Sequence, residues 1–229
     1  AGTTGRFWNV AAIRGRQSHY AIESRLGFAA GNFPWPTVLD TQTAIAHRGR
    51  QDSSSVDTLT DAIALIGDVS PDYAEWIGNV VDGFLLANGP ASYGISSPDF
   101  PGLIALSSTG GLLDYVESTV AGACHQYLFQ LLLVTPLTAG GTEEIHYIPA
   151  RRFYLTTRRA LIAAHVHANV IAVLARVAAH PKHAAAARMR MARRRLMLDT
   201  DCWPALERCT QLTEAGSELY ACVRALPAT

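Results

Sequence analysis

Apolar residues recur at helical spacing through most of the second half of the chain. The longest such segment spans residues 110–134, where leucines and valines at three- and four-residue steps predict an amphipathic helix with a wide apolar face. Residues 161–179 show the same period, and residues 184–198 favour a helix by composition, with arginines among their alanines. Two shorter helices are predicted after these, one from Trp203 through Leu212 and one from a cap at Thr213.

The middle of the chain begins with two predicted helices. One starts near Ser55 and ends before Ser70, a favourable cap that is followed by Pro71 at the first helical position. The second helix is predicted to run from there through Phe84 to the Gly-Pro stop signal at residues 89–90. Together these segments predict a pair of antiparallel helices, an αα-hairpin.

Short apolar runs bounded by turn residues interrupt the helical pattern. Residues 103–107 predict a buried strand, and residues 144–149 predict a second extended piece. The predicted fold class is therefore mainly α with one or two short β-strands. We expect a helix and a proline-containing extended anchor over residues 1–54. Residues 55–229 are expected to form a single compact helical domain around the long central helix.

The amino-acid composition limits the classes of function that this chain can have. Nineteen basic and nineteen acidic residues cancel, so no global charge attracts nucleic acid or an anionic membrane. We find no signal-peptide pattern and no uncharged apolar run of membrane-spanning length, and therefore expect a soluble, cytoplasmic protein. The four cysteines show no CxxC spacing, which favours a reducing compartment. Hydrophobic residues make up 49% and charged residues 17%, which leaves little polar surface and indicates a buried subunit interface.

The central helix has part of a metal-site motif. Glu117, Ala121 and His125 are four residues apart and share one helix face. In helices of the HExxH kind, two histidines at this spacing bind one metal, and a glutamate stands beside the first. Here the second histidine is present as His125, while Ala121 and Gly122 occupy the other two positions. Taken alone, a single histidine on a helix is more often a hydrogen-bonded core residue than a ligand.

Several motifs follow one another in a recognisable order. These are SSPDFPGLIALSS, a helix of the form ExxVxGxCHQ, the segment HYIPAR, and a later apolar helix with histidines, over about residues 55–225. The order resembles the HExxH-containing peptide-modification proteins, which are 2-oxoglutarate-dependent β-hydroxylases of ribosomally made peptides. The residues that fall on family positions are Glu117, His125, Gln126, Tyr147, Pro149 and Arg151.

The resemblance implies a non-haem iron site, and this chain departs from it. Iron in such sites takes three protein ligands that face one side. This chain offers two at best, His125 and one of His165 and His167. The last two are two residues apart on one helix, so they point about 200° apart and cannot chelate one metal together. The remaining candidates for a third ligand are Cys124, His146 and Glu117.

Arginines and aromatic residues indicate where a peptide substrate would bind. By the resemblance, Arg151 and Tyr147 are candidate substrate-binding residues, since an arginine holds a carboxylate such as that of 2-oxoglutarate through two hydrogen bonds. A solvated basic turn is the alternative interpretation of Arg151. The five arginines within residues 188–195 are either the solvated face of an alanine-rich helix or a docking surface for an acidic leader peptide or partner.

The resulting hypothesis is a degenerate family member, a non-catalytic or accessory subunit of a heteromeric peptide hydroxylase. It would act in complex formation and peptide binding. A related subunit with the intact HExxH motif would complete the heterodimer, hold most of the Fe(II) and 2-oxoglutarate, and hydroxylate the precursor peptide at a β-carbon. Two alternatives stay open: a self-sufficient metal-dependent peptide hydroxylase with a rearranged ligand set, and a plain helical binding module.

Overall fold

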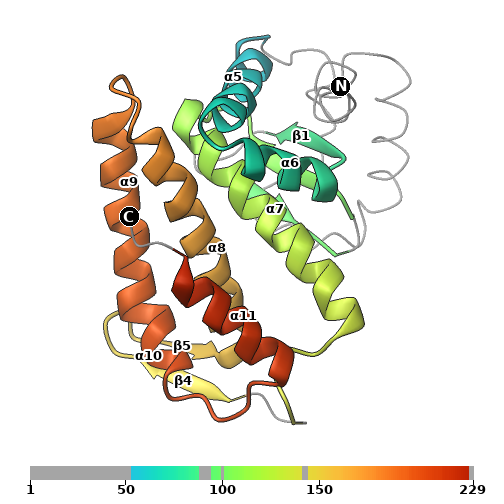
Figure 1. The fold of residues 1–229 in the computed structure, drawn as a ribbon, viewed down its shortest axis with the longest axis vertical. Helices are drawn as coiled ribbons and strands as arrows, with labels where there is room; N and C mark the ends of the chain where they lie inside the picture. The colour runs from blue at the N-terminus through green and yellow to red at the C-terminus, as the bar shows by residue number, and fades with distance from the viewer. Residues whose placement is uncertain (1–52, 88–93, 99–100, 141–143, 227–229) are drawn as a thin grey trace. The chain divides into compact units, whose positions relative to one another are not determined.

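The computed structural model describes residues 53–87, 94–98, 101–140 and 144–226. The chain divides into two compact units, and the boundary between Gln126 and Tyr127 lies inside one long helix. Helices are the main elements of both units (Figure 1), which confirms the predicted mainly helical class. The predicted N-terminal helix and extended anchor lie almost wholly outside the described residues, and the division into residues 1–54 and 55–229 stays a prediction.

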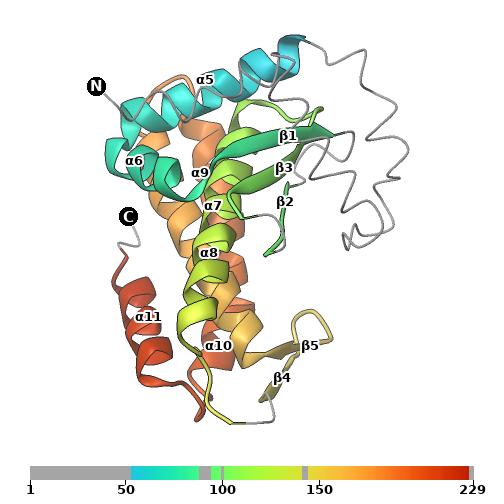
Figure 2. The same ribbon diagram turned by 90° about the vertical axis from the view of Figure 1, so that its right-hand side faces the viewer.

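The first unit combines two helices and a small sheet with the first part of a long helix. Its described elements are α5 (Ser53–Val69), α6 (Pro71–Val80), β1 (Gly83–Ala87), β2 (Gly94–Ser96), β3 (Leu103–Ser107) and the start of α7 (Leu112–Val134). The strand order is β1-β3-β2, with β1 parallel and β2 antiparallel to β3 (Figure 2). Every described element except β2 contributes to the core, for example through Leu59, Ile77, Phe84, Ile104 and Tyr115, all of which are buried.

One prediction for the first unit is wrong. The helix that begins at Pro71 ends at Val80, and Gly83–Ala87 is the strand β1 rather than the last turns of that helix. A short apolar run is compatible with a helix or a strand, and here parallel pairing with β3 decides the conformation. Gly102 supports this pairing, because its carbonyl accepts hydrogen bonds from the amides of Asp82 and Gly83. Its φ of 77° is one that glycine adopts readily.

The second unit is organised around the apolar helix α8. Its described elements are the end of α7, β4 (Ile145–Ile148), β5 (Phe153–Thr156), α8 (Thr157–Val177), α9 (Ala184–Met197), the π-helical turn η2 (Leu198–Cys202), α10 (Trp203–Leu206) and α11 (Glu214–Ala225). Helix α9 runs beside α8 (Figure 1), and η2, α10, α11 and β5 also contact α8. Buried residues therefore occur along the whole length of α8.

A hairpin connects α7 to α8. The extended piece predicted at residues 144–149 is strand β4, and it pairs antiparallel with β5, which the sequence did not predict. The hairpin is fastened to the start of α8, since the Thr157 amide donates to the Glu144 carbonyl at 3.0 Å. The Thr157 hydroxyl lies 2.8 Å from Nε2 of His146. Thr156 caps α8 by accepting a hydrogen bond from the amide of Arg159.

One further expectation for the second unit needs correction. The helix predicted to run from Trp203 through Leu212 ends at Leu206, after a π-helical turn that has no simple sequence signature. In addition, α8 is long and apolar enough to cross a membrane by length and composition, and it is the one described helix that meets these criteria. In the structure, 72% of the qualifying segment is buried, as in a core helix.

Candidate functional site

Residues 121–125, the segment that resembles part of an HExxH motif, lie on helix α7 where it packs against β3. Gly122 is buried there, and a Cβ atom built at this position would lie 2.7 Å from both Cδ1 and Cγ2 of Ile104. Ile104 itself is fully buried. The hydroxyl of Ser96 on β2 donates to the Gly122 carbonyl at 3.2 Å. The volume that a glutamate would need at this position is therefore filled by Ile104.

Gln126 fastens the same stretch of α7 to the start of β3. Its side-chain oxygen accepts a hydrogen bond from the Gly102 amide at 3.0 Å, and its side-chain nitrogen donates to the Leu103 carbonyl at 2.8 Å. The residue is buried, so both backbone groups depend on it rather than on water. Gln126 is one of the positions that matched the family pattern, and in this structure it has a structural role.

His125 is half-buried on α7 in the first unit. Burial lowers the pKa of its imidazole below the ordinary value of 6.5, which favours the neutral ring at physiological pH. The neighbouring Cys124 is fully buried, and burial raises the pKa of its thiol far above the ordinary value. A thiol that stays protonated is a poor metal ligand and a poor nucleophile, so Cys124 is a core residue here.

The residues present do not fit the iron site that the family resemblance implies. Ala121 has no lone pair, and position 122 is closed by Ile104. Within the described residues of either unit, no three His, Cys, Asp or Glu side chains come together in a group suited to a metal ion. The donor set around His125 therefore lacks the three ligands that non-haem iron takes.

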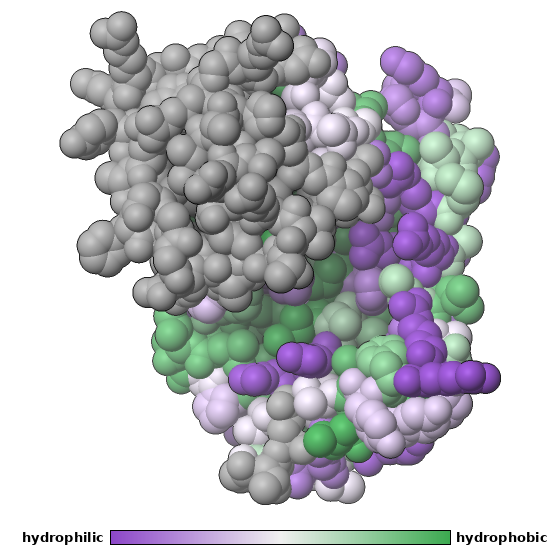
Figure 3. All heavy atoms as spheres, turned by 180° about the vertical axis from the view of Figure 1, so that it is seen from behind, coloured by the Kyte–Doolittle hydropathy of each residue, from purple (hydrophilic) through white to green (hydrophobic). Residues whose placement is uncertain are grey.

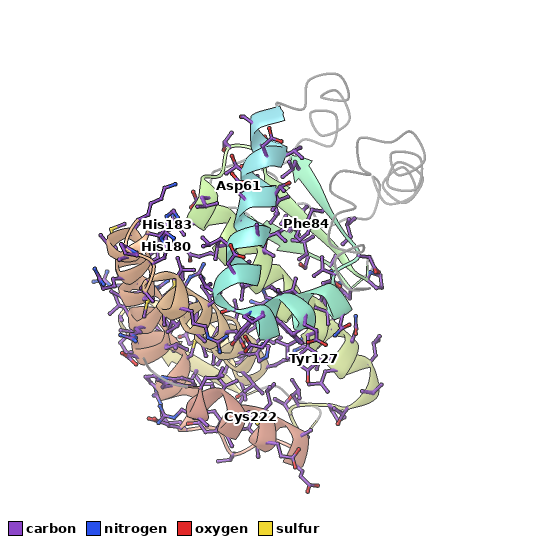
Figure 4. The ribbon with its side chains drawn as sticks, turned by 45° about the horizontal axis from the view of Figure 1, so that its top comes forward. Asp61, Phe84, Tyr127, His180, His183 and Cys222 are labelled. Carbon is purple, nitrogen blue, oxygen red and sulfur yellow. The ribbon has the colours of Figure 1, made fainter. Side chains whose placement is uncertain are left out.

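His165 and His167 lie in the second unit and point to different neighbours. His165 is buried, and its ring stacks on that of Tyr127, with ring centroids 5.8 Å apart and an interplanar angle of 18°. Tyr127, labelled in Figure 4, stands at the start of this unit's part of α7. His167 lies on the α9 side, where Nη1 of Arg194 is 3.2 Å from its Nδ1. Because a guanidinium only donates, Nδ1 of His167 is the acceptor in this contact. The predicted divergence of the two rings is confirmed.

Arg151, a candidate for binding a carboxylate, already holds one from its own chain. Its Nε is 2.8 Å from Oδ2 of Asp201, which belongs to η2 and is nearly buried, and the Thr200 hydroxyl donates to the other Asp201 oxygen at 2.6 Å. Next to this ion pair, burial and the Asp201 carboxylate raise the pKa of the Cys202 thiol to about 12. In the structure, Arg151 thus ties the β4–β5 hairpin to η2.

Tyr147 lies on the exposed face of the hairpin, opposite Tyr154 on the neighbouring strand. The two ring centroids are 5.2 Å apart, and the side chains are well exposed, Tyr154 more than Tyr147. Ile145 adds a third exposed apolar side chain on the same face, because alternate residues of a strand point to one side. Of the two predicted substrate-binding residues, Tyr147 is the one whose side chain is presented to solvent beside another aromatic ring.

Some polar contacts escaped the sequence analysis because they join distant segments. No feature of the sequence identified Asp201 as the partner of Arg151, or Arg194 as the partner of His167.

His180 and His183 lie together in the turn between α8 and α9 (Figure 4), with ring centroids 5.2 Å apart. The pKa of the His183 imidazole is lowered by slight burial and by the charges of His180 and Lys182. Two imidazoles beside a lysine are too few donors for a metal site of the predicted kind.

Comparison with known proteins does not assign the chain to a family. No protein-family model matches it, and no curated protein matches it significantly. The family resemblance therefore rests on the motifs of the sequence alone.

Proposed function

We propose that this chain is a non-catalytic subunit of a heteromeric peptide hydroxylase. A related subunit with an intact HExxH motif would bind the Fe(II) and 2-oxoglutarate and carry out the hydroxylation of a ribosomally made peptide. This chain would contribute to complex formation and to peptide binding. The motif order in the sequence supports the hydroxylase family, and the residues around His125 support a role without metal chemistry.

The observation that carries this proposal is the close contact between Gly122 and Ile104. The side chain of Ile104 on β3 occupies the space that the glutamate of an HExxH motif would need. Buried helix positions at van der Waals contact do not admit a larger residue without repacking. Core packing between α7 and β3 at this position supports a role for this part of the helix in stability rather than in metal binding.

The peptide-binding part of the proposal rests on the exposed face of the β4–β5 hairpin. Tyr147 and Tyr154 offer two adjacent aromatic rings to an extended peptide, and aromatic side chains contribute strongly to binding surfaces. Arg151 lies at the end of the same hairpin, so a peptide carboxylate would have to compete with Asp201 for its guanidinium. We therefore assign the primary contact to Tyr147 and a secondary one to Arg151.

The decisive experiment is reconstitution. The chain is purified alone and together with a related subunit that has the intact motif, and each preparation is given a precursor peptide, Fe(II), 2-oxoglutarate and oxygen. We expect the peptide to gain the mass of one oxygen atom with the complex and not with the lone chain. Metal analysis should find stoichiometric iron in the complex only.

Two variants sharpen this test. Ala121→His combined with Gly122→Glu restores the motif in sequence, and we expect it to destabilise the fold without giving stoichiometric iron to the lone chain. Tyr147→Ala should raise the KM for the peptide in the complex while leaving its iron content unchanged. Oxidation of the peptide by the lone chain, with consumption of 2-oxoglutarate, would overturn the proposal.

A further inference from the structure

Helix α9 has apolar residues on two opposite faces. Ala187 and Met191 are buried and face the rest of the second unit. On the other side, Ala185, Met189, Ala192 and Leu196 are all exposed, with 69% of Met189 and 59% of Leu196 accessible to solvent. The alanine-rich helix is therefore not simply a solvated helix with one buried face. We call these four exposed residues the α9 seam.

The spacing of the α9 seam is that of one strand of a coiled coil. Its residues follow one another at steps of four, three and four, which are the steps between the a and d positions of a heptad. At about 100° per residue, all four lie within about 60° of the direction opposite the buried face. The seam thus forms one continuous stripe about 17 Å long on the outer side of α9.

Arginines border the α9 seam on both sides. Arg188 precedes a seam residue and Arg193 follows one, and both are exposed, so they occupy the g and e positions that contact a partner helix. Arg195 stands at the next g position, but it is half-buried and its Nε is buried. Arg194 instead points inward to His167. Helix α9 contains no acidic residue. Figure 3 shows hydrophilic and hydrophobic side chains alternating along the edge of the molecule where α9 lies.

We propose that the α9 seam docks an acidic amphipathic helix of the peptide substrate. An apolar stripe would pack on Met189 and Leu196, and acidic side chains beside that stripe would pair with Arg188 and Arg193. A second copy of α9 does not fit, because arginines would face arginines across the contact. A stripe of three turns is too small for a stable interface between subunits, whereas it suits a short helical segment.

This inference rests on the proposed function for the identity of the ligand, since it names the segment of the substrate that recruits it. The hairpin face around Tyr147 and the α9 seam would then contact different parts of one peptide. Two contacts joined by a flexible linker bind more tightly than either alone.

The test measures binding of a labelled synthetic helix to the full chain by fluorescence anisotropy. The probe has leucine at its a and d positions and glutamate at e and g, and a second probe has lysine in place of glutamate. We expect the acidic probe to bind, the basic probe to bind at least about tenfold more weakly, and added salt to weaken the acidic one. Equal binding of both probes would overturn the proposal.

Surface variants locate the contact. Leu196→Glu and Arg193→Glu should each weaken binding of the acidic probe about tenfold or more, while circular dichroism shows the helix content retained. Arg152→Glu, which makes the same charge change on the exposed turn of the hairpin, is the matched control and should have little effect. Binding that survives the α9 variants, or that only anionic vesicles or duplex DNA achieve, would contradict the proposal.

The two proposals fail differently. If the reconstituted complex hydroxylates the peptide but Leu196→Glu leaves its KM unchanged, the docking inference is wrong and the proposed function stands. If the lone chain proves to be a hydroxylase, the proposed function is wrong, and the anisotropy assay still decides whether α9 binds an acidic helix.

Discussion

Gly122 and Ile104 occupy one small volume in the first unit, and their contact decides what this helix position tolerates. A Cβ atom at position 122 would come within 3.0 Å of three side-chain atoms of Ile104. Glycine inside a helix is otherwise unfavourable by about 1 kcal/mol relative to alanine. The close approach to a buried strand residue gives the physical reason why glycine suits this position.

We predict that Gly122→Ala lowers the free energy of unfolding by about 1–3 kcal/mol, because the new methyl group forces Ile104 out of its position. The matched control is Gly67→Ala in α5, where nothing lies within 4 Å of an added Cβ. That change should stabilise the protein by up to about 1 kcal/mol. Denaturant unfolding of both variants shows whether each change raises or lowers the free energy of unfolding. Stabilisation by Gly122→Ala would contradict the packing argument.

A second prediction concerns His125 and pH. Burial holds its pKa below the ordinary value of 6.5, so between these two values the unfolded chain binds more protons than the folded one. The contribution of the neutral His125 side chain to the free energy of unfolding is therefore fully present above about pH 6.5. This contribution is lost as the pH falls toward the lowered pKa. We expect His125→Asn to make unfolding less sensitive to pH in this window. An unchanged pH profile of the unfolding midpoint would contradict this prediction.

At the scale of elements, the second unit uses side chains to fasten its hairpin. Arg151 reaches Asp201 on η2, and Glu144 accepts hydrogen bonds from the amide and the hydroxyl of Thr210, at 3.1 and 2.7 Å. The hydrogen bonds from Thr210 lower the pKa of the Glu144 carboxyl. These contacts join β4 and its turn to the segments that follow α9, so the hairpin is held in place although it has only two strands.

We predict that Arg151→Ala destabilises the protein by about 1–3 kcal/mol, between the values for exposed and buried ion pairs. Arg151 is partly exposed, whereas Asp201 is nearly buried and would lose its counter-charge. The neighbouring Arg152→Ala makes the same change on an exposed residue and should alter stability by less than about 0.5 kcal/mol. If both variants lose the same stability in thermal unfolding experiments, the ion pair contributes nothing specific.

For the whole molecule, the exposed apolar residues are concentrated in one unit. Within the described part of the chain, the large hydrophobic side chains that are exposed all belong to the second unit: Leu133, Val134, Ile145, Tyr147, Tyr154, Met189 and Leu196. Equal numbers of acidic and basic residues leave little net charge to keep copies apart near neutral pH. The isolated chain therefore combines exposed apolar surface with weak charge repulsion.

We predict that the isolated chain is least soluble near its isoelectric point of about 7.3. Leu133→Glu combined with Val134→Glu should raise solubility at this pH, because both side chains are more than 80% exposed at the end of α7. Ala225→Glu on the exposed side of α11 is a control with a smaller expected effect. Light scattering across a pH series measures all three proteins, and a solubility minimum far from pH 7.3 would contradict the prediction.

Periodicity in the sequence was sufficient to predict α5, α7, α8, α9, α11 and β3, because each of these has a long apolar pattern or clear boundary residues. It was not sufficient for Gly83–Ala87, whose five residues suit a helix or a strand equally until β3 pairs with them. The opposite directions of His165 and His167 followed from helix geometry alone. Their neighbours, Tyr127 and Arg194, did not, since they come from other helices.

The absence of two HExxH residues was visible in the sequence, but its structural meaning was not. Only the packing of β3 on α7 shows that Ile104 fills the space beside Gly122, because that contact joins residues far apart along the chain. The pairing of Arg151 with Asp201 likewise depends on the tertiary fold. Local spacing determines which face of a helix a residue occupies, while contacts between distant segments determine whether that face is closed, paired or presented to a ligand.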